Sequence, residues 1–167
     1  EPAIHIWVVA PNFAQSRQAW NELKQFIPES MVVRRKKTQG GGRGDGWKED
    51  ERSVWLNLKS PGLARRNVYM EIKSADDPES LQTAGPDFIW ITEAQDIKEA
   101  AWNKLRPMLN SSGRLGRGCI EGIPPFQRNH WFSKLFKWAQ ENPTEDYESF
   151  HATSFDNVFL SEKQKEA

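Results

Sequence analysis

The fold of this chain is decided by residues 87–96, which read DFIWITEAQD. Four consecutive apolar residues, Phe88 to Ile91, predict a strand buried on both faces, because a half-exposed strand would alternate apolar with polar positions. The strand then ends at Thr92 and Glu93. Ligands bind open α/β sheets at the carboxyl ends of the strands. A carboxylate at this point is therefore a candidate for activating water in a nucleotide hydrolase.

The composition indicates one globular domain. The 167 residues are 28% charged and 37% hydrophobic, with eight Trp and nine Phe to supply buried area. Because 23 basic residues balance 23 acidic ones, the net charge does not argue for nucleic acid, although a local basic face is compatible with it. The single Cys119 excludes an internal disulfide and is interpreted as a small core residue. No stretch reaches the roughly 20 apolar residues of a membrane helix, so a soluble cytoplasmic protein is expected.

The residues before 87 predict a strand, a helix and two further strands. Residues 4–9 are almost wholly apolar and predict a buried central strand. Asn12 is a good N-cap for an amphipathic helix that ends before Pro28. Residues 54–58 and 68–73 partly alternate, which predicts strands with one exposed face.

A glycine-rich stretch, residues 40–46, invites comparison with a phosphate-binding loop. Gly41 and Gly46 have the separation of the two glycines in G-x-x-x-x-G-K-[ST]. Trp47 stands where the motif needs lysine, and no helical pattern follows. The stretch is therefore interpreted as a hairpin connection, with phosphate binding as the alternative.

The residues after 96 predict two helices and two extended segments. Asp96 is expected to cap a helix that ends or kinks at Pro107, which would lack a helical hydrogen bond there. A short strand is expected from Gly118, and a second helix is expected to start after Asn129 as its cap. Residues 147–155 alternate loosely and predict a last extended segment.

This alternation of strands and helices predicts an α/β fold, with a mostly parallel sheet flanked by helices on both faces. Right-handed crossovers place the carboxyl ends of parallel strands along one edge. The turns at residues 10–12, 92–94 and 122–124 would meet there, and their meeting point is the candidate site.

The order of these segments resembles the ATPase domain of tailed-phage terminase large subunits. The resemblance spans residues 4–160 and rests on a strand ending VVAP (8–11), SADDPESL (74–81), FIWITEAQ (88–95), Trp102 with LRPML (105–109), and GIP (122–124). It implies a P-loop NTPase fold of the ASCE type in a motor that packages double-stranded DNA into procapsids. It also implies a second, metal-dependent nuclease domain.

Within this resemblance, residues 88–93 match the Walker B strand, and Glu93 matches the glutamate that orients and deprotonates the attacking water. Thr92 falls where the family usually has an aspartate that helps hold Mg²⁺, so the metal side loses a charge. Gly122, Ile123 and Pro124 match the coupling motif, often Gly-Thr-Pro in relatives. Gln82 and Thr83 replace the arginine that follows the matching leucine in many relatives.

The family's phosphate loop would lie before Glu1. Residues 1–160 are therefore expected to be a partial ATPase domain, incomplete at its N-terminal side, and residues 161–167 the start of a linker or helix leading to an absent nuclease domain. ATP and Mg²⁺ are the implied cofactors of the intact protein; this piece alone is expected to bind neither and to be inactive. The implied partners are double-stranded DNA, the portal protein, the small terminase subunit and further copies in a ring, without a membrane, in the cytoplasm of the infected bacterium.

Several alternatives stay open. Glu93 and Asp96 could simply favour the N-terminus of the following helix. Six basic residues could contact DNA phosphates or merely be solvated: Arg34, Arg35, Lys36, Lys37, Arg114 and Arg117. The whole chain could also be a fragment of a helicase-type ATPase, or a non-catalytic scaffold or DNA-binding module with the same fold.

Overall fold

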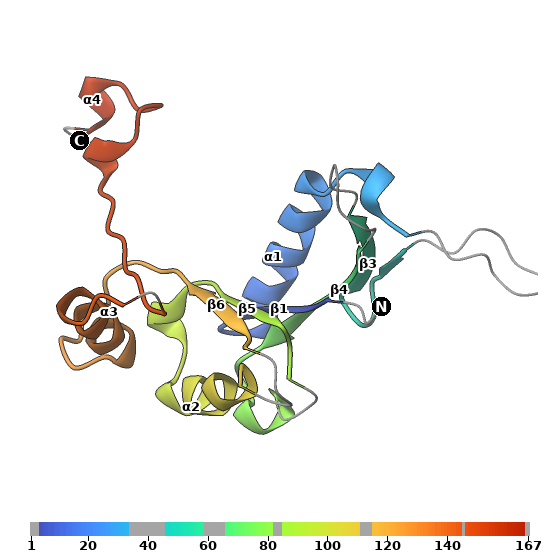
Figure 1. Cartoon of the computed structure of the whole chain (residues 1–167). Helices are drawn as coiled ribbons and strands as arrows, with labels where there is room; N and C mark the ends of the chain where they lie inside the picture. Colours follow the sequence, from blue (N-terminus) through green and yellow to red (C-terminus); the bar gives the residue numbers. More distant parts are fainter. Residues whose placement is uncertain are drawn as a thin grey trace, which may run out of the picture. The chain divides into compact units, whose positions relative to one another are not determined.

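The computed structural model describes residues 4–33, 46–58, 66–81, 85–110, 115–144 and 146–165. The chain forms two compact units, Glu1–Pro124 and Pro125–Ala167. The first unit is built on a six-stranded sheet with the order β2-β3-β4-β1-β5-β6 (Figure 1). Its strands are β1 (Ile4–Ala10), β2 (Trp47–Lys48), β3 (Ser53–Leu58), β4 (Arg66–Ser74), β5 (Phe88–Ile91) and β6 (Arg117–Ile120).

The centre of the sheet is β1, which has a parallel neighbour on each side. Ile4 lies opposite Val68 of β4, and Ile6 lies opposite Phe88 of β5. β5 continues in parallel to β6, whereas β3 joins β4, and β2 joins β3, in antiparallel fashion. The predicted α/β fold with a mostly parallel sheet is confirmed, and the carboxyl ends of four strands share one edge.

One face of the sheet is covered by α1 (Phe13–Phe26). The side chain of Asn12 accepts a hydrogen bond from the Gln15 N–H at 2.9 Å, which confirms the predicted N-cap. Trp20 of α1 packs edge-to-face on Trp47 at 5.0 Å between ring centroids. The apolar cluster beneath α1 contains the buried residues Val8, Trp20, Val54, Leu56, Val68 and Ile72.

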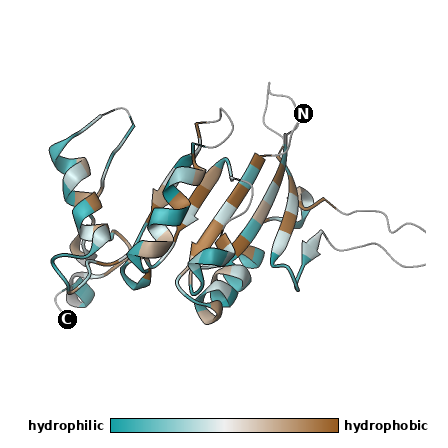
Figure 2. Cartoon of the chain, turned by 90° about the horizontal axis from the view of Figure 1, so that it is seen from below, coloured by the Kyte–Doolittle hydropathy of each residue, from teal (hydrophilic) through white to brown (hydrophobic). Residues whose placement is uncertain are grey.

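The other face carries α2 (Glu99–Met108) together with the short 3₁₀ segment η2 (Pro78–Leu81) (Figure 1). Ala101 and Leu105 of α2 are fully buried, as are Ile89 and Ile91 of β5. Brown, hydrophobic residues accordingly concentrate in the strands of Figure 2, with teal on the helices. The prediction that β5 is buried on both faces is half right, because Phe88 and Trp90 on the α1 side are only partly buried.

A polar cluster interrupts the face of the β1–β4 pair, centred on the Glu71 carboxylate. Glu71 pairs with His5 Nε2 at 2.7 Å and with Lys73 Nζ at 3.3 Å, and it accepts hydrogen bonds from the buried Trp7 Nε1 at 3.0 Å and from Tyr69 Oη at 3.2 Å. Burial alone would raise the pKa of Glu71, but its partners His5 and Lys73 together leave that pKa below its ordinary value. The cluster thus holds an ionised carboxylate against the sheet.

Two predicted caps are wrong. Asp96 belongs to the 3₁₀ turn η3 (Ala94–Asp96), and α2 begins only after Lys98, whose side chain makes no capping hydrogen bond. Ile97 and Lys98 are extended after this 3₁₀ turn, so α2 starts at Glu99 rather than directly after Asp96. In the second unit, His130 rather than Asn129 is the N-cap of α3 (Trp131–Glu141), because its ring nitrogen accepts from the Phe132 N–H at 3.2 Å.

Two other expectations are also wrong. Cys119 is exposed rather than part of the core, because β6 lies at the edge of the sheet. Residues 147–155 form no strand: Tyr147 makes one isolated bridge with Thr144, and the chain then enters the 3₁₀ turn η5 (Ser154–Asp156). In the part of the chain that the structure describes, this segment has no neighbouring strand to complete a ladder.

The second unit contains α3, η5 and the short α4 (Glu162–Lys165). Trp131 and Ala139 of α3 are buried, and Trp138 packs edge-to-face on Tyr147 at 4.8 Å. Phe150, Phe155 and Phe159 are exposed. Among the described residues of both units, no helix has the length and apolarity to cross a membrane.

Candidate active site

The candidate site is the carboxyl edge of the sheet beside β5. The Thr92 N–H donates to the Val9 carbonyl at 3.0 Å, and the Glu121 N–H donates to the Ile91 carbonyl at 2.9 Å. These bonds extend the ladder by one residue on each side of β5. They bring the turn at residues 92–94 next to the ends of β1 and β6, as parallel pairing predicts.

Glu93 has a rare backbone conformation. Its φ of 53° and ψ of 47° lie in the left-handed region, which it shares with only one other non-glycine in the described ranges, Arg52. This geometry costs an L-residue about 1–2 kcal/mol and is enriched at functional sites. Glu93 turns the chain from β5 into η3, and its carboxylate is exposed at the edge.

Gln95 connects Glu93 with the next strand's end. Its Nε2 donates to the Glu93 carboxylate, and its Oε1 accepts from the Ile123 N–H at 3.1 Å. A backbone bond runs beside it, from the Ala94 N–H to the Glu121 carbonyl at 2.9 Å. Glu93 and residues 122–124 therefore belong to one hydrogen-bonded assembly. Sequence reasoning missed Gln95; its position two residues after an acid at a strand end was the available signal.

The other residues of this edge fix the start of α1. The Asp76 carboxylate accepts from the Phe13 N–H at 3.0 Å and from the Ser74 hydroxyl at 3.0 Å. The guanidinium of Arg52 bonds to the buried Ser16 hydroxyl and lies over the Phe13 ring. An acid near a helix N-terminus favours the helix, so this group stabilises the turn after β1.

The side chains at this edge can be compared with those that bind a divalent cation in other proteins. No group of three or more His, Cys, Asp or Glu side chains suited to a metal occurs among the residues that the structure describes. Mg²⁺ typically keeps several waters and takes one or two protein oxygens with the phosphates of its nucleotide. The half-buried Thr92 hydroxyl at the end of β5 fits such a water-mediated role, without contributing charge.

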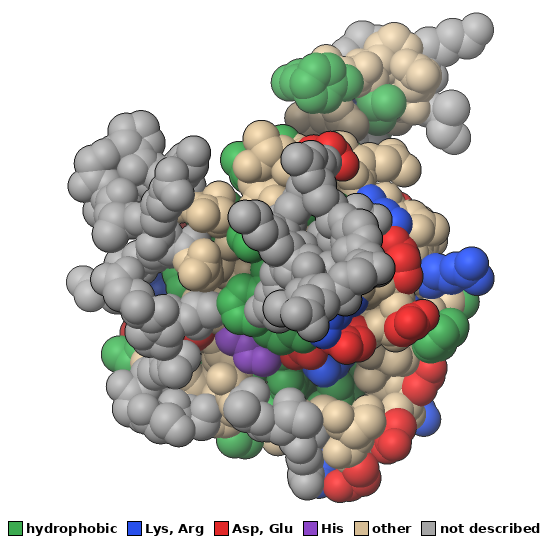
Figure 3. Space-filling view, turned by 90° about the vertical axis from the view of Figure 1, so that its right-hand side faces the viewer, with side chains coloured by type: hydrophobic (Ala, Val, Ile, Leu, Met, Phe, Trp, Pro, Cys, Tyr) green, Lys and Arg blue, Asp and Glu red, His purple; other side chains and the backbone are tan. Residues whose placement is uncertain are grey.

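Most of the basic residues that were predicted to contact DNA lie outside the residues that the structure describes. Arg34, Arg35, Lys36, Lys37 and Arg114 lie outside the described residues, as do Gln82 and Thr83. Arg117 is described and is exposed at the start of β6, the end opposite Glu93. Among the described residues on the face seen in Figure 3, acidic and basic side chains are interspersed.

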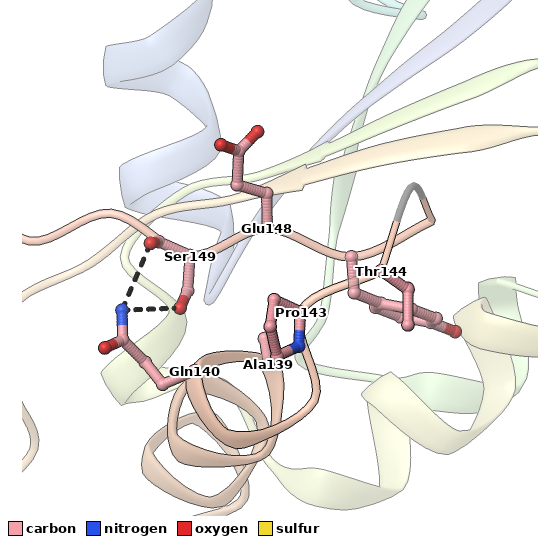
Figure 4. Close-up of a pocket in the computed structure, with 7 residues that line it drawn as sticks. Ala139, Gln140, Pro143, Thr144, Glu148 and Ser149 are labelled. Atoms are coloured by element: carbon pink, nitrogen blue, oxygen red, sulfur yellow. Dashed lines mark hydrogen bonds between the residues drawn. The ribbon is translucent and has the colours of Figure 1, made fainter.

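A shallow hollow in the second unit is a separate feature (Figure 4). It is lined by Ala139, Gln140, Pro143, Thr144, Tyr147, Glu148 and Ser149. The Gln140 amide donates to the carbonyl and the hydroxyl of Ser149 at 3.2 and 3.0 Å. Among the described residues of this lining, Glu148 is the one acid.

Comparison with known proteins gives matches among solved structures. No protein-family model matches the chain, and no curated protein matches it. The ATPase domain of the Thermus phage P74-26 large terminase matches with a TM-score of 0.55 and 21% identity, over 81% of this chain and 53% of that one. The large terminase of a thermophilic bacteriophage matches with a TM-score of 0.72 and 14% identity, over 99% of this chain and 37% of that one.

The chain therefore spans about half of the first of these proteins and just over a third of the second. The thermophilic phage terminase also matches in its complex with ADP, with a TM-score of 0.71 and 14% identity over the same shares of the two chains. At these identities the likeness concerns the fold. This chain has the fold found in part of the ATPase domain of phage large terminases.

Proposed function

We propose that this chain is part of the ATP-hydrolysing motor domain of a viral terminase large subunit, which packages double-stranded DNA into procapsids. The observation that carries the proposal is Glu93, an exposed carboxylate in a left-handed turn at the carboxyl end of β5, within this fold. Phosphoryl transfer requires mainly a positioned nucleophile and compensation of charge. A carboxylate held at this edge can position the nucleophile, which is the attacking water.

In this proposal each residue of the edge has a defined role. Glu93 orients the attacking water and accepts its proton. The Thr92 hydroxyl hydrogen-bonds a water of the Mg²⁺ that accompanies ATP. Residues 122–124, the coupling segment, transmit the state of the nucleotide to the parts that grip DNA. Bound ATP with Mg²⁺ supplies the phosphoryl group and the positive charge that neutralises its oxygens.

The phosphate loop is proposed to lie upstream of residue 1. β6 offers a place for the strand that would carry it, because among the described strands β6 pairs only with β5. Arg117, Gly118 and Cys119 are exposed there. A further strand on this edge would end beside residues 122–124, with β6 between it and β5, and a loop of backbone N–H groups there could hold phosphates near Glu93.

The wider assembly belongs to the same proposal. Double-stranded DNA, the portal protein, the small terminase subunit and further copies in a ring are the proposed partners, in the cytoplasm of an infected bacterium. Contacts from Arg117 and the other predicted basic residues would go to phosphates, so DNA binding should weaken with salt and be indifferent to sequence. A C-terminal nuclease domain would follow residue 167 in the intact protein.

The decisive experiment replaces Glu93 by Gln in the intact protein. We expect ATP turnover to fall by about 100-fold or more, because the amide cannot accept a proton, while nucleotide binding is retained. Glu99→Gln is the matched control, since Glu99 is also an exposed carboxylate and lies in the first turn of α2. Normal turnover in Glu93→Gln, with turnover also normal in Glu99→Gln, would refute the assignment.

A non-catalytic scaffold or DNA-binding module is the second candidate. It is favoured by Thr92, which brings no negative charge to the metal side of the site. The same measurements separate the two: a scaffold would bind DNA but show no ATP turnover even in the wild-type intact protein. A helicase-type ATPase would instead separate DNA strands as it hydrolyses ATP.

A further inference from the structure

The side chain of Gln95 touches two functional parts at once. Its amide NH₂ donates to the Glu93 carboxylate, and its carbonyl accepts from the Ile123 N–H at 3.1 Å. Glu93 belongs to the turn after β5, whereas Ile123 lies in the coupling segment after β6. We call this side chain with its two bonds the Gln95 bridge.

The chemistry of the two partners fixes the orientation of the amide. A carboxylate only accepts hydrogen bonds and a backbone N–H only donates, so the NH₂ must face Glu93 and the carbonyl must face Ile123. The flipped amide would set oxygen against oxygen and N–H against N–H. Both halves of the bridge therefore depend on the same side-chain position, and displacing either partner disturbs the other.

We propose that Gln95 is a positioning residue that ties the placement of the Glu93 carboxylate to the coupling segment. This inference rests on the proposed function of Glu93. When residues 122–124 hold their position, Gln95 fixes the rotamer of Glu93 toward the attacking water. When they move, Gln95 loses the Ile123 N–H and releases the carboxylate, so hydrolysis responds to the segment without a direct contact between Ile123 and Glu93.

Two features support a bridge rather than incidental packing. Ile123 is 64% exposed, so apolar burial does little to anchor the coupling segment at this point. The left-handed backbone of Glu93 costs conformational energy, and such strain is found mainly at functional sites. The Gln95 side chain restrains the carboxylate that this backbone presents. The hydrogen bond from the Ala94 N–H to the Glu121 carbonyl joins the two backbones nearby but does not involve the Glu93 carboxylate.

The test uses three substitutions of Gln95 in the intact protein. Gln95→Met keeps the length but loses both bonds, and we expect kcat for ATP to fall about tenfold or more, with KM changed less than about threefold. Gln95→Glu keeps an acceptor for Ile123 but sets a second negative charge beside Glu93, and kcat should fall at least as far. Gln95→His can donate from one ring nitrogen and accept at the other, and it should restore part of the rate.

Gln18 provides the matched control. It makes the same kind of amide-to-carboxylate bond, to Glu22 at 2.9 Å, on the exposed side of α1. Gln18→Met should leave kcat and KM unchanged. The second control is the double variant: if Gln95 acts through Glu93, adding Gln95→Met to Glu93→Gln should reduce the residual rate no further.

The outcomes separate this inference from the proposal beneath it. Normal turnover in Glu93→Gln would refute the catalytic role of Glu93, and the bridge with it. Loss of turnover in Glu93→Gln, with normal kcat in Gln95→Met, would refute the bridge alone. A full further loss in the double variant would also refute it, since Gln95 would then act independently of Glu93. Retained KM together with partial rescue by Gln95→His would support it against simple misfolding.

Discussion

The sheet surface under α1 and the carboxyl edge at Glu93 are stabilised in opposite ways. Under α1, Trp20 is 2% exposed and Val54 is fully buried, and both sit in a continuous apolar cluster. At the edge, Glu93 and Ile123 are exposed, Glu93 has a strained backbone, and their two turns are joined through the side chain of Gln95, although Ala94 beside Glu93 is buried. Stability is therefore concentrated away from the candidate site, which leaves the edge free to change its contacts.

The largest expected effect on stability comes from disrupting the apolar cluster under α1. Trp20→Ala should lower the free energy of unfolding by about 3–5 kcal/mol, because it removes a buried ring and its packing on Trp47. Denaturant titration would measure the loss. Phe26→Ala is the control on the same helix; it is 79% exposed and should cost less than about 0.5 kcal/mol. Equal losses in the two variants would contradict the placement of the core.

The next effect concerns the polar cluster on the β1–β4 pair. Glu71→Ala should cost about 1–3 kcal/mol at neutral pH, because His5, Lys73 and the buried Trp7 N–H lose the carboxylate that they share, and the Trp7 N–H keeps only His5 Nε2 at 3.0 Å as an acceptor. The folded-state pKa of Glu71 is lowered, so its contribution is present above its ordinary pKa and disappears as the pH falls through the folded value.

Unfolding titrations at several pH values check this sign. The stability gap between wild type and Glu71→Ala should narrow steadily below about pH 4.5. Glu79→Ala, whose carboxylate is 71% exposed in its pair with Lys104, serves as the control and should show little gap at any pH. A gap that widens on acidification would show that Glu71 is not held in its charged form.

At the carboxyl edge of the sheet, we expect one substitution to increase stability by a smaller amount. Glu93→Gly should raise the free energy of unfolding by up to about 1 kcal/mol, because glycine adopts the left-handed conformation without steric cost. The same variant should abolish ATP turnover in the intact protein. Thermal unfolding of Glu93→Gly should be compared with that of Glu93→Gln. Both variants lose the charge, but Glu93→Gln keeps a non-glycine residue in the left-handed conformation, so the difference between them reports the relief of strain. A Glu93→Gly variant less stable than Glu93→Gln would contradict the strain.

The smallest effect on stability comes from labelling the β6 edge. Cys119 is exposed and is the chain's single cysteine, so an alkylating reagent should modify the folded 167-residue chain without unfolding it. Partial desolvation of the thiol, together with the nearby charge of Glu121, raises the pKa of Cys119, so the reaction should be slow at neutral pH and accelerate as the pH rises.

The same label tests where an upstream strand would lie. In a longer protein that carries the proposed phosphate loop, a strand on β6 should slow alkylation of Cys119 by about tenfold or more. Cys119→Ser provides the unlabelled reference. Equal rates in the short and long proteins would place that strand elsewhere.

Sequence patterns predicted the central elements well, because those elements obey strong local rules. The apolar run of β1, the Asn12 cap and the alternation of strands with helices led to a parallel sheet with the turn after β5 at one edge. Glu93 was named from its position at a strand end. Its role remains a proposal, but its place at the carboxyl edge is where the pattern put it.

The rest depended on tertiary context that local patterns do not contain. The predicted cap at Asp96 is wrong because Asp96 belongs to the 3₁₀ turn η3, which follows the left-handed Glu93. Cys119 was predicted to be a core residue because its strand was interpreted as apolar, yet β6 begins with the exposed Arg117 and its position at the sheet edge leaves Cys119 exposed. Gln95 was missed because its partner Ile123 is 28 residues away, and no spacing rule connects the two.

The pairing of β1 also has a consequence during synthesis. Trp7 reaches its partner Glu71 across 64 residues, and His5 reaches Asp87 across 82. This largely apolar central strand therefore leaves the ribosome long before either neighbour exists. Until β4 and β5 emerge, an apolar segment with two unpaired edges must stay apart from other nascent chains. Slow translation or a holding chaperone at this stage should decide the yield of folded protein more than the final stability of the sheet.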